Sequence, residues 1–173
     1  MKNIYIVGFM GTGKTVVGRA LAQKARVIFV DLDSCIEEKE NMTINDIFKA
    51  KGEAYFRSIE KETLFNAAQQ KGAVISCGGG VVVDPDNMAR MKETGICVCL
   101  AASPQEILKR IGVTKHRPLL HSGDPLDRIQ SLLSSRDSYY RQADILIDTT
   151  HLSIEEIAAA ILEKLPPEYN NKK

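Results

Sequence analysis

One eight-residue run restricts the fold of this chain more than any other feature. Residues 8–15, G-F-M-G-T-G-K-T, match the pattern G-x-x-x-x-G-K-[ST] of the phosphate-binding P-loop. An apolar run at residues 4–7 precedes it and predicts a buried strand, and residues 16–22 predict the start of a helix. Glycines let backbone N–H groups turn inward on a phosphate, and a helix N-terminus adds partial positive charge there. The sequence therefore predicts a nucleotide site at this strand–helix junction.

The residue types in this loop predict separate contacts to a nucleotide. We expect Lys14 to reach the β- and γ-phosphates and the Thr15 hydroxyl to hold Mg²⁺. An accidental glycine-rich turn is the alternative, but the strand before it and the helix after it argue against that. The residues that we expect to contact ATP from this loop are Gly11, Thr12, Gly13, Lys14, Thr15 and Val16.

Composition favours one soluble domain without a strong electrostatic field. The chain has 173 residues, 44% of them hydrophobic, which is enough for one domain with a substantial core. Its 23 Lys and Arg residues nearly balance 22 Asp and Glu, so nothing suggests binding to nucleic acid or an anionic membrane. The first strand begins directly after the N-terminus, and the four cysteines form no C-x-x-C pair. We expect a cytoplasmic monomer with reduced, mostly buried thiols.

Five short apolar runs predict the strands of a parallel sheet. They lie at residues 4–7, 27–30, 73–76, 96–100 and 145–147, and helical patterns separate them. Because the runs are continuous rather than alternating, we expect a three-layer α/β fold with helices covering both faces of the sheet. Helix starts are predicted where a capping residue precedes proline or a short acidic run: at Asp84, Ser103, Asp124 and Ser153.

Two stretches exceed a minimal strand–helix repeat. One is the helical excursion from about residue 34 to 71, and the other is the polar segment from about 112 to 124. Such insertions lie at the carboxyl ends of the strands, where ligands bind in folds of this class. We interpret the first as a substrate-binding subdomain and the second as a mobile lid within a single domain of residues 1–173.

Asp31 and Asp33 end the second predicted strand and should project at its carboxyl edge. One acid could orient Mg²⁺ while the other accepts a hydrogen bond from an attacking hydroxyl group. Either could instead cap the next helix, a common role for aspartate. No acid ends the third predicted strand, which favours Asp31 for the metal.

The motif at residues 52–57, G-E-A-Y-F-R, and the glycines at 78–80 suggest a second binding site. Arg57 and Phe56 could offer a bidentate fork and an apolar wall to a small carboxylate. The three glycines indicate a turn that other residues could not make, or a ligand lying on bare backbone. An isolated arginine on a helix is more often a surface residue, and the same holds for Arg117 and Arg136.

Together, these motifs resemble the shikimate kinase family, and they cover essentially the whole chain in order. The matching elements are the P-loop, Asp31 and Asp33, residues 52–57, the glycines at 78–80, R-P-L-L at 117–120, and Arg136 with Tyr139 and Tyr140. The resemblance implies ATP-dependent phosphorylation of the shikimate 3-hydroxyl with Mg²⁺. Related nucleoside-monophosphate-kinase-like folds imply strand order 2-3-1-4-5.

The same resemblance assigns roles to individual residues. In the family pattern, Asp33 meets the ring hydroxyls, and Arg57 and Arg136 hold the carboxylate of shikimate. Arg117 closes over the reacting phosphates, and Arg110 lies against the adenine. Gly79 and Gly80 line the substrate pocket.

One departure from the family pattern concerns stability rather than chemistry. Where the family often has Leu-Gly after the P-loop helix, this chain has Ala25-Arg26 and so lacks a favourable C-cap glycine. Two other functions remain open at this point. They are another small-molecule kinase of gluconate or nucleotide type, and a non-catalytic nucleotide-dependent binding module.

Overall fold

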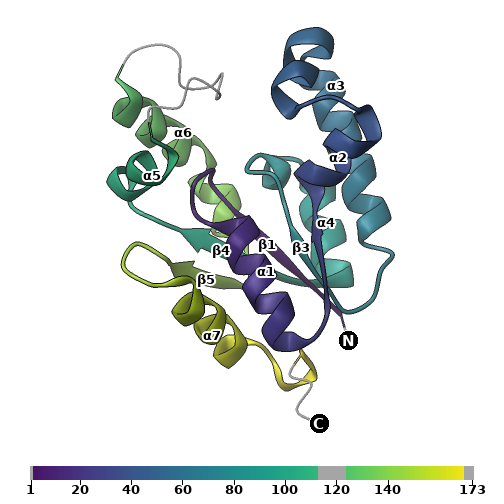
Figure 1. Ribbon diagram of the computed structural model, residues 1–173, viewed down its shortest axis with the longest axis vertical. Helices are drawn as coiled ribbons and strands as arrows, with labels where there is room; N and C mark the ends of the chain where they lie inside the picture. Colours follow the sequence, from purple (N-terminus) through teal and green to yellow (C-terminus); the bar gives the residue numbers. More distant parts are fainter. Residues whose placement is uncertain (1, 113–123, 170–173) are drawn as a thin grey trace.

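A computed structural model describes residues 2–112 and 124–169 and shows a five-stranded, all-parallel sheet at the centre of the molecule (Figure 1). The strand order is β2-β3-β1-β4-β5, which confirms the predicted order. Each strand lies on or beside one of the five predicted apolar runs. The strands are β1 (Asn3–Gly8), β2 (Ile28–Asp31), β3 (Ala73–Ser76), β4 (Gly95–Ala101) and β5 (Ile145–Asp148).

Helices cover both faces of this sheet, as predicted. One face packs against α1 (Lys14–Ala25) and α7 (Ile154–Lys164), and the other packs against the remaining helices (Figure 1). Those are α2 (Leu32–Glu40), α3 (Ile44–Ala67), α4 (Pro85–Thr94), α5 (Pro104–Ile111) and α6 (Pro125–Tyr140). Short 3₁₀ turns, η1 (Val81–Val83) and η3 (Pro167–Tyr169), complete the described elements.

Alternation along the central strand explains the two-sided core. Tyr5 and Val7 of β1 point into the larger cluster, while Ile4 and Ile6 point into the cluster shared by α1 and α7. All four side chains are fully buried. A strand with both faces buried needs a continuous apolar run, which is the pattern that β1 shows.

The two edge strands are less buried than their continuous apolar runs suggest. Ile28 of β2 is 52% exposed and Leu146 of β5 is 55% exposed. An edge strand has a neighbour on one side only, so the helical layers cover it less completely. Apolar continuity in the sequence therefore predicted the strands but not their places in the sheet.

The predicted helix starts are confirmed by their hydrogen bonds. The side chains of Asp84, Ser103, Asp124 and Ser153 each accept a backbone N–H from the first turn of the following helix. Ser153 and Glu156 form a complete capping box. Each cap satisfies N–H groups that have no partner inside the helix.

Arg26 occupies the position where the family pattern places glycine. It ends α1 with φ 56° and ψ 45°, in the left-handed region, and its N–H bonds to carbonyls of the last turn. A residue with a Cβ pays a steric cost there that glycine avoids. Arg26 therefore forms the C-cap in the left-handed conformation that glycine would adopt at lower steric cost, as the sequence suggested.

The excursion between β2 and β3 forms its own small layer above the sheet edge. Its helix α3 is broken at Gly52, where φ is 81° and ψ is 172°. A Cβ at this position would meet no atom within 4 Å, so the positive φ rather than lack of space favours glycine. Its two helices share a separate apolar cluster of Ile36, Ile47, Phe56 and Ile59.

The cysteines and the lengths of the helices can be compared with what the sequence suggested. All four cysteines are free, and Cys77, Cys97 and Cys99 are buried, as predicted. Among residues 2–112 and 124–169, none of the helices combines the length and apolar character needed to cross a membrane.

Candidate functional site

A cavity of about 350 Å³ lies where the carboxyl ends of β1 and β3 meet the P-loop, α3 and α6. It brings together residues from six separate stretches of the chain. In Figure 1, α2 and α3 stand on one side of this end of the sheet, and α5 and α6 stand on the other. The lining includes Met10, Gly11, Gly13, Lys14, Thr15, Val16, Asp33, Ile44, Phe48, Phe56, Arg57, Glu60, Gly78, Gly79, Gly80 and Arg136.

The P-loop reaches this cavity through a left-handed turn. Gly13 is the N-cap of α1 and has φ 92°, a conformation that residues with a Cβ rarely adopt. Lys14 lines the cavity, and its Nζ donates to the Phe9 carbonyl oxygen over 2.9 Å. This contact lays the lysine side chain across the loop.

Thr12 is placed differently from its neighbours in the loop. It is buried, and both its hydroxyl group and its N–H donate to the Phe9 carbonyl oxygen, over 2.8 and 3.4 Å. Thr12 does not line the main cavity, and its hydrogen bonds stabilise the conformation of the loop. Its predicted contact to ATP stays a prediction.

The two aspartates divide between two positions. Asp31 ends β2 and accepts the Thr15 hydroxyl on Oδ2 over 2.7 Å and the Ser34 N–H on Oδ1 over 3.3 Å. It therefore caps α2 and contacts the P-loop at once. Asp33 was predicted to end the strand as well, but it lies in the first turn of α2, where it lines the cavity. The helix begins earlier than predicted because Asp31 caps it.

Arg57 approaches the cavity held between two carboxylates of its own helix. Nη1 donates to Glu60 Oε2 over 2.6 Å, and Nη2 donates to Glu53 Oε1 over 3.2 Å. The guanidinium lies 5.2 Å from the centre of the Phe56 ring, in a cation–π contact. With 32% of its side chain exposed, Arg57 is a partly buried cavity residue rather than a surface one.

Glu60 is the most deeply buried charged residue of the site. Its exposed fraction is 1%, and its Oε1 has no hydrogen-bond partner among the described residues. Burial raises the pKa of the Glu60 carboxyl, and the nearby Arg57 opposes this shift only in part. An acid held this way stabilises the orientation of Arg57 at the cost of its own desolvation.

The three glycines after β3 make room for these side chains. None of them has a positive φ, so the turn itself does not require glycine. A Cβ at Gly78 would lie 2.5 Å from Glu60 Oε1, and a Cβ at Gly80 would lie 2.5 Å from Arg57 Nη1. The turn alone therefore does not account for these glycines: Gly78 and Gly80 leave room for the Glu60 and Arg57 side chains, and the expected ligand on bare backbone stays a prediction.

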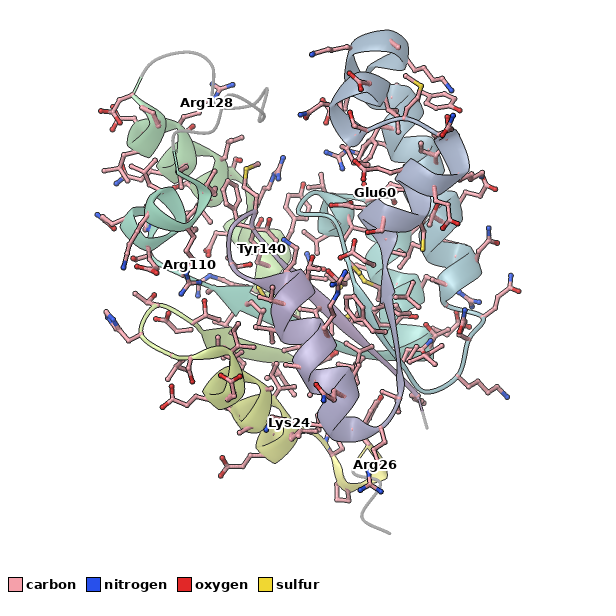
Figure 2. All side chains as sticks on the ribbon, viewed as in Figure 1. Lys24, Arg26, Glu60, Arg110, Arg128 and Tyr140 are labelled. Atoms are coloured by element: carbon pink, nitrogen blue, oxygen red, sulfur yellow. The ribbon has the colours of Figure 1, made fainter. Side chains whose placement is uncertain are left out.

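On the opposite side of the cavity, α6 contacts the same glycine turn. Tyr140 donates its hydroxyl group to the Gly79 carbonyl over 2.6 Å, and Arg136 Nη1 donates to the same oxygen over 3.4 Å. Figure 2 places Tyr140 on α6 and Glu60 on α3, with the P-loop end of the sheet between the two helices. Burial raises the pKa of Tyr140 to about 12, so the hydroxyl stays a donor at neutral pH.

One further predicted residue, Arg110, lies away from this cavity. Arg110 is on α5, and its guanidinium donates to Thr149 Oγ1 over 3.0 Å and to the Thr149 carbonyl over 2.7 Å (Figure 2). It does not line the main cavity. Arg117 and most of the predicted lid lie outside the described residues, and their roles stay predictions.

Sequence reasoning missed two contributors to the cavity, Glu60 and Phe48. Glu60 follows Arg57 by three residues on one helix, a spacing that signals an ion pair but not its burial. Phe48 and Phe56 stack with ring centroids 4.6 Å apart, from opposite sides of the Gly52 break. Only the positions of the helices make these pairs visible.

The oxygen atoms near Thr15 suit Mg²⁺. Within residues 2–112 and 124–169 there is no group of three or more His, Cys, Asp or Glu side chains placed to hold a metal ion. Mg²⁺ bound with a nucleotide needs fewer protein ligands, because phosphate oxygens and waters fill the remaining positions. The Thr15 hydroxyl and the Asp31 carboxylate, 2.7 Å apart, fit that requirement.

Comparison with protein families places the chain among known kinases. The family model described as Shikimate kinase matches residues 10–166. A shikimate kinase of Thermoanaerobacter pseudethanolicus is 44% identical over 163 residues, covering 94% of this chain and 95% of that protein. One from Thermodesulfovibrio yellowstonii is also 44% identical and covers 99% of both chains.

Solved structures resemble this chain at two levels, one of family and one of fold alone. A shikimate kinase of Acinetobacter baumannii in complex with shikimate aligns with a TM-score of 0.90, 37% identity and 96% coverage of both chains. A gluconokinase of Sinorhizobium meliloti aligns with a TM-score of 0.55 but only 15% identity, a likeness of fold alone. The match over nearly the full length, with the P-loop and the two cavity arginines in place, shows that this chain belongs to the shikimate kinase family.

Proposed function

We propose that the main cavity binds shikimate beside the γ-phosphate of ATP and that the chain phosphorylates the shikimate 3-hydroxyl. A chain of this family is a kinase that transfers a phosphoryl group from ATP to a hydroxyl group of shikimate. The single observation that supports the proposed residues is the cavity of about 350 Å³, because it joins Lys14 and Thr15 to Asp33, Arg57 and Arg136.

The P-loop side supplies the phosphate-binding groups of this proposal. Backbone N–H groups at Gly11 and Gly13, with the N-terminus of α1, hold the β- and γ-phosphates. Lys14 stabilises the charge that spreads over the phosphoryl oxygens during transfer. Arg110 and Arg117 keep their proposed positions against the adenine and over the phosphates, respectively.

Thr15 and Asp31 are the proposed protein ligands to Mg²⁺, directly or through water. When bound, the metal neutralises charge on the β- and γ-phosphates. The hydroxyl of Thr15 and the carboxylate of Asp31 already face one another at 2.7 Å, so little rearrangement is needed to hold one cation.

On the acceptor side, Asp33 is the proposed general base. It accepts the proton of the shikimate hydroxyl as that oxygen attacks the γ-phosphorus in line and the bond to the ADP oxygen breaks. Arg57 and Arg136 bind the shikimate carboxylate and so fix the angle of attack. Ile44, Phe48 and Phe56 provide the apolar wall for the ring.

The organisation of the chain in the cell is also a proposal. All proposed ligands come from one chain, which supports a monomer, and the four free cysteines with ATP as co-substrate support the cytoplasm. Residues 1–173 act as one domain, with residues 34–71 as the substrate-binding part and 112–124 as the lid.

A substrate panel tests the proposal directly. Purified protein with Mg²⁺-ATP should release ADP far faster with shikimate than with gluconate or AMP, measured in one coupled assay. Asp33→Asn should retain ATP binding and lose most turnover, whereas Asp31→Asn should raise the Mg²⁺ requirement. Preference for gluconate or AMP contradicts the substrate, and Mg²⁺ rescue of Asp33→Asn alone reverses the roles of the two acids.

A further inference from the structure

The break at Gly52 divides α3 into two parts with different anchors. The part after Gly52 is fixed to the body of the protein. Lys61 Nζ donates to Asp84 Oδ2 over 3.0 Å and to Asp86 Oδ2 over 2.6 Å at the start of α4, and Leu64 is fully buried in the main core. The part before Gly52 contributes no residue to that core, and its Ile47 packs in the small cluster that Phe56 and Ile59 join from after the break. The angle at Gly52 therefore decides where the first part lies.

One carboxylate holds both sides of this break. Glu40, the last residue of α2, accepts Lys51 Nζ over 2.6 Å and the Tyr55 hydroxyl over 3.0 Å on the same oxygen, Oε2. Lys51 immediately precedes Gly52, and Tyr55 follows it by three residues. Lys51 Nζ also donates to the Tyr55 hydroxyl over 3.2 Å and lies 4.5 Å from the centre of its ring.

The Glu40 side chain is only 9% exposed, unlike the carboxylates of the other surface ion pairs nearby. Glu62, which pairs with Lys39 between the same two helices, is 57% exposed. Lys51 lowers the pKa of the Glu40 carboxyl, so it remains charged through the neutral range. A shielded ion pair with two donors orients its partners more firmly than a single exposed pair does.

The angle at Gly52 also sets the apolar wall of the cavity. Phe48 lies before the break and Phe56 after it, and their rings are 4.6 Å apart. Both rings line the cavity, together with Ile44 from the first part of α3. Phe56 in turn contacts the Arg57 guanidinium at 5.2 Å. A change of angle at Gly52 would separate these two walls and change the fit of a ring between them.

We propose that Glu40, Lys51 and Tyr55 form a positioning cluster that fixes the angle at Gly52 and so sets the affinity of the cavity for its acceptor substrate. None of the three residues lines the cavity, so they act through Phe48, Phe56 and Arg57. The cluster has no contact with the P-loop, and its effect falls on the acceptor and not on ATP. The inference depends on the proposed placement of shikimate in this cavity.

A charge exchange tests the cluster. Glu40→Lys and Lys51→Glu each place like charges together, and each should raise KM for shikimate about three- to fivefold with kcat and KM for ATP nearly unchanged. The double variant Glu40→Lys with Lys51→Glu restores an opposite-charge pair and should return KM to within about twofold of wild type. Tyr55→Phe, which removes one hydroxyl group, should raise KM by about twofold.

Matched measurements separate this inference from its alternatives. Glu93→Gln breaks the Arg90–Glu93 pair, at 2.7 Å on α4, and should leave every kinetic constant unchanged. Arg57→Lys, measured alongside, tests the placement of the substrate itself. If Arg57→Lys leaves KM for shikimate unchanged, the placement is wrong.

If Arg57→Lys raises KM but the Glu40 and Lys51 variants do not, the positioning cluster is wrong. It is also wrong if the two single variants lower the melting temperature without raising KM, or if the double variant fails to recover.

Discussion

The two walls of the cavity are held in place by different kinds of interaction. The P-loop wall rests on main-chain geometry: Gly13 takes a left-handed conformation, and β1 behind it is buried along its whole length. The α2–α3 wall rests on side chains: the Arg57–Glu60 and Lys51–Glu40 ion pairs and a small separate apolar cluster. One wall is an extension of the core, and the other is attached to it.

This difference suits the two tasks of a phosphoryl-transfer site. Phosphates present the same shape and charge in every turnover, so a preformed backbone cradle costs no rearrangement. An acceptor with several hydroxyl groups and one carboxylate must be distinguished from related acids, and paired side chains offer that discrimination. Variants in the first wall should therefore change kcat. Apart from Asp33, the proposed general base at the start of α2, variants in the second should change KM for the acceptor.

The largest effect should come from the P-loop wall. Lys14→Ala removes a positive charge from the developing phosphoryl charge, and kcat should fall roughly 10²- to 10³-fold. Lys24→Ala, in the last turn of the same helix, serves as the control and should leave kcat unchanged. A kcat within tenfold of wild type for Lys14→Ala would contradict the claim that the P-loop wall acts mainly on kcat.

Arg57→Ala should show the contrasting behaviour of the other wall. The carboxylate of the acceptor carries the same charge before and during transfer, so losing its proposed partner Arg57 should weaken both states alike. KM for shikimate should rise roughly 30- to 150-fold, more than kcat falls. Steady-state kinetics decide the point, and a defect in kcat alone would place Arg57 with the reacting phosphate instead.

Gly80→Ala should disturb the same arginine through space. The new Cβ would lie 2.5 Å from Nη1 and 2.6 Å from Nη2 of Arg57, so the guanidinium must shift. We expect KM for shikimate to rise about three- to tenfold, with little change in kcat. In an Arg57→Ala background the same change should have almost no further effect. Additive effects would mean that Gly80 acts on the substrate directly.

Glu60 should give the α2–α3 wall a pH dependence. Because burial raises its folded-state pKa above the ordinary 4.5, the folded protein binds this proton more tightly than the unfolded chain does. Its contribution to stability is therefore full below pH 4.5 and is lost as pH rises through the folded-state pKa. Urea unfolding of wild type against Glu60→Gln across this range measures it.

The opposite slope, with wild type gaining stability over Glu60→Gln as pH rises, would show that pairing with Arg57 outweighs burial. In the Arg57→Ala background the loss of stability with rising pH should become steeper, because burial then acts without an opposing charge.

The smallest effect should lie outside both walls, at Arg26. Arg26→Gly relieves a left-handed conformation and should stabilise the protein by about 0.5–1 kcal/mol with unchanged kinetics. Asn41→Gly is a matched comparison, since Asn41 has φ 51° but asparagine tolerates this region better. Thermal unfolding should therefore show a larger gain at Arg26. An equal gain at both sites would mean that residue type has little influence there.

The sequence was most informative about the P-loop wall, because local patterns specify it. A fixed spacing of glycine, lysine and threonine between a strand and a helix predicted the phosphate cradle. Elsewhere in the chain, capping residues predicted four helix starts that the structure confirms. These features depend on backbone groups within a few residues of each other. Reading them requires no knowledge of distant contacts.

The α2–α3 wall was predicted only in outline. Its motif and its arginine were found, but the burial of Glu60, the stacking of Phe48 on Phe56 and the shared oxygen of Glu40 were not. The glycines at 78–80 were predicted to form a special turn or to carry a ligand on bare backbone, and only the structure shows that Gly78 and Gly80 leave room for Glu60 and Arg57.

By itself, the sequence determined the class of fold, the parallel strands and the phosphate cradle, since these follow from hydrophobic runs and short-range backbone chemistry. Tertiary structure alone decided which strands lie at the exposed edges and which acid is desolvated beside Arg57. It also decided the angle at which α3 bends at Gly52. Burial and the angle between helices depend on every element that packs nearby, and no short stretch of sequence contains that information.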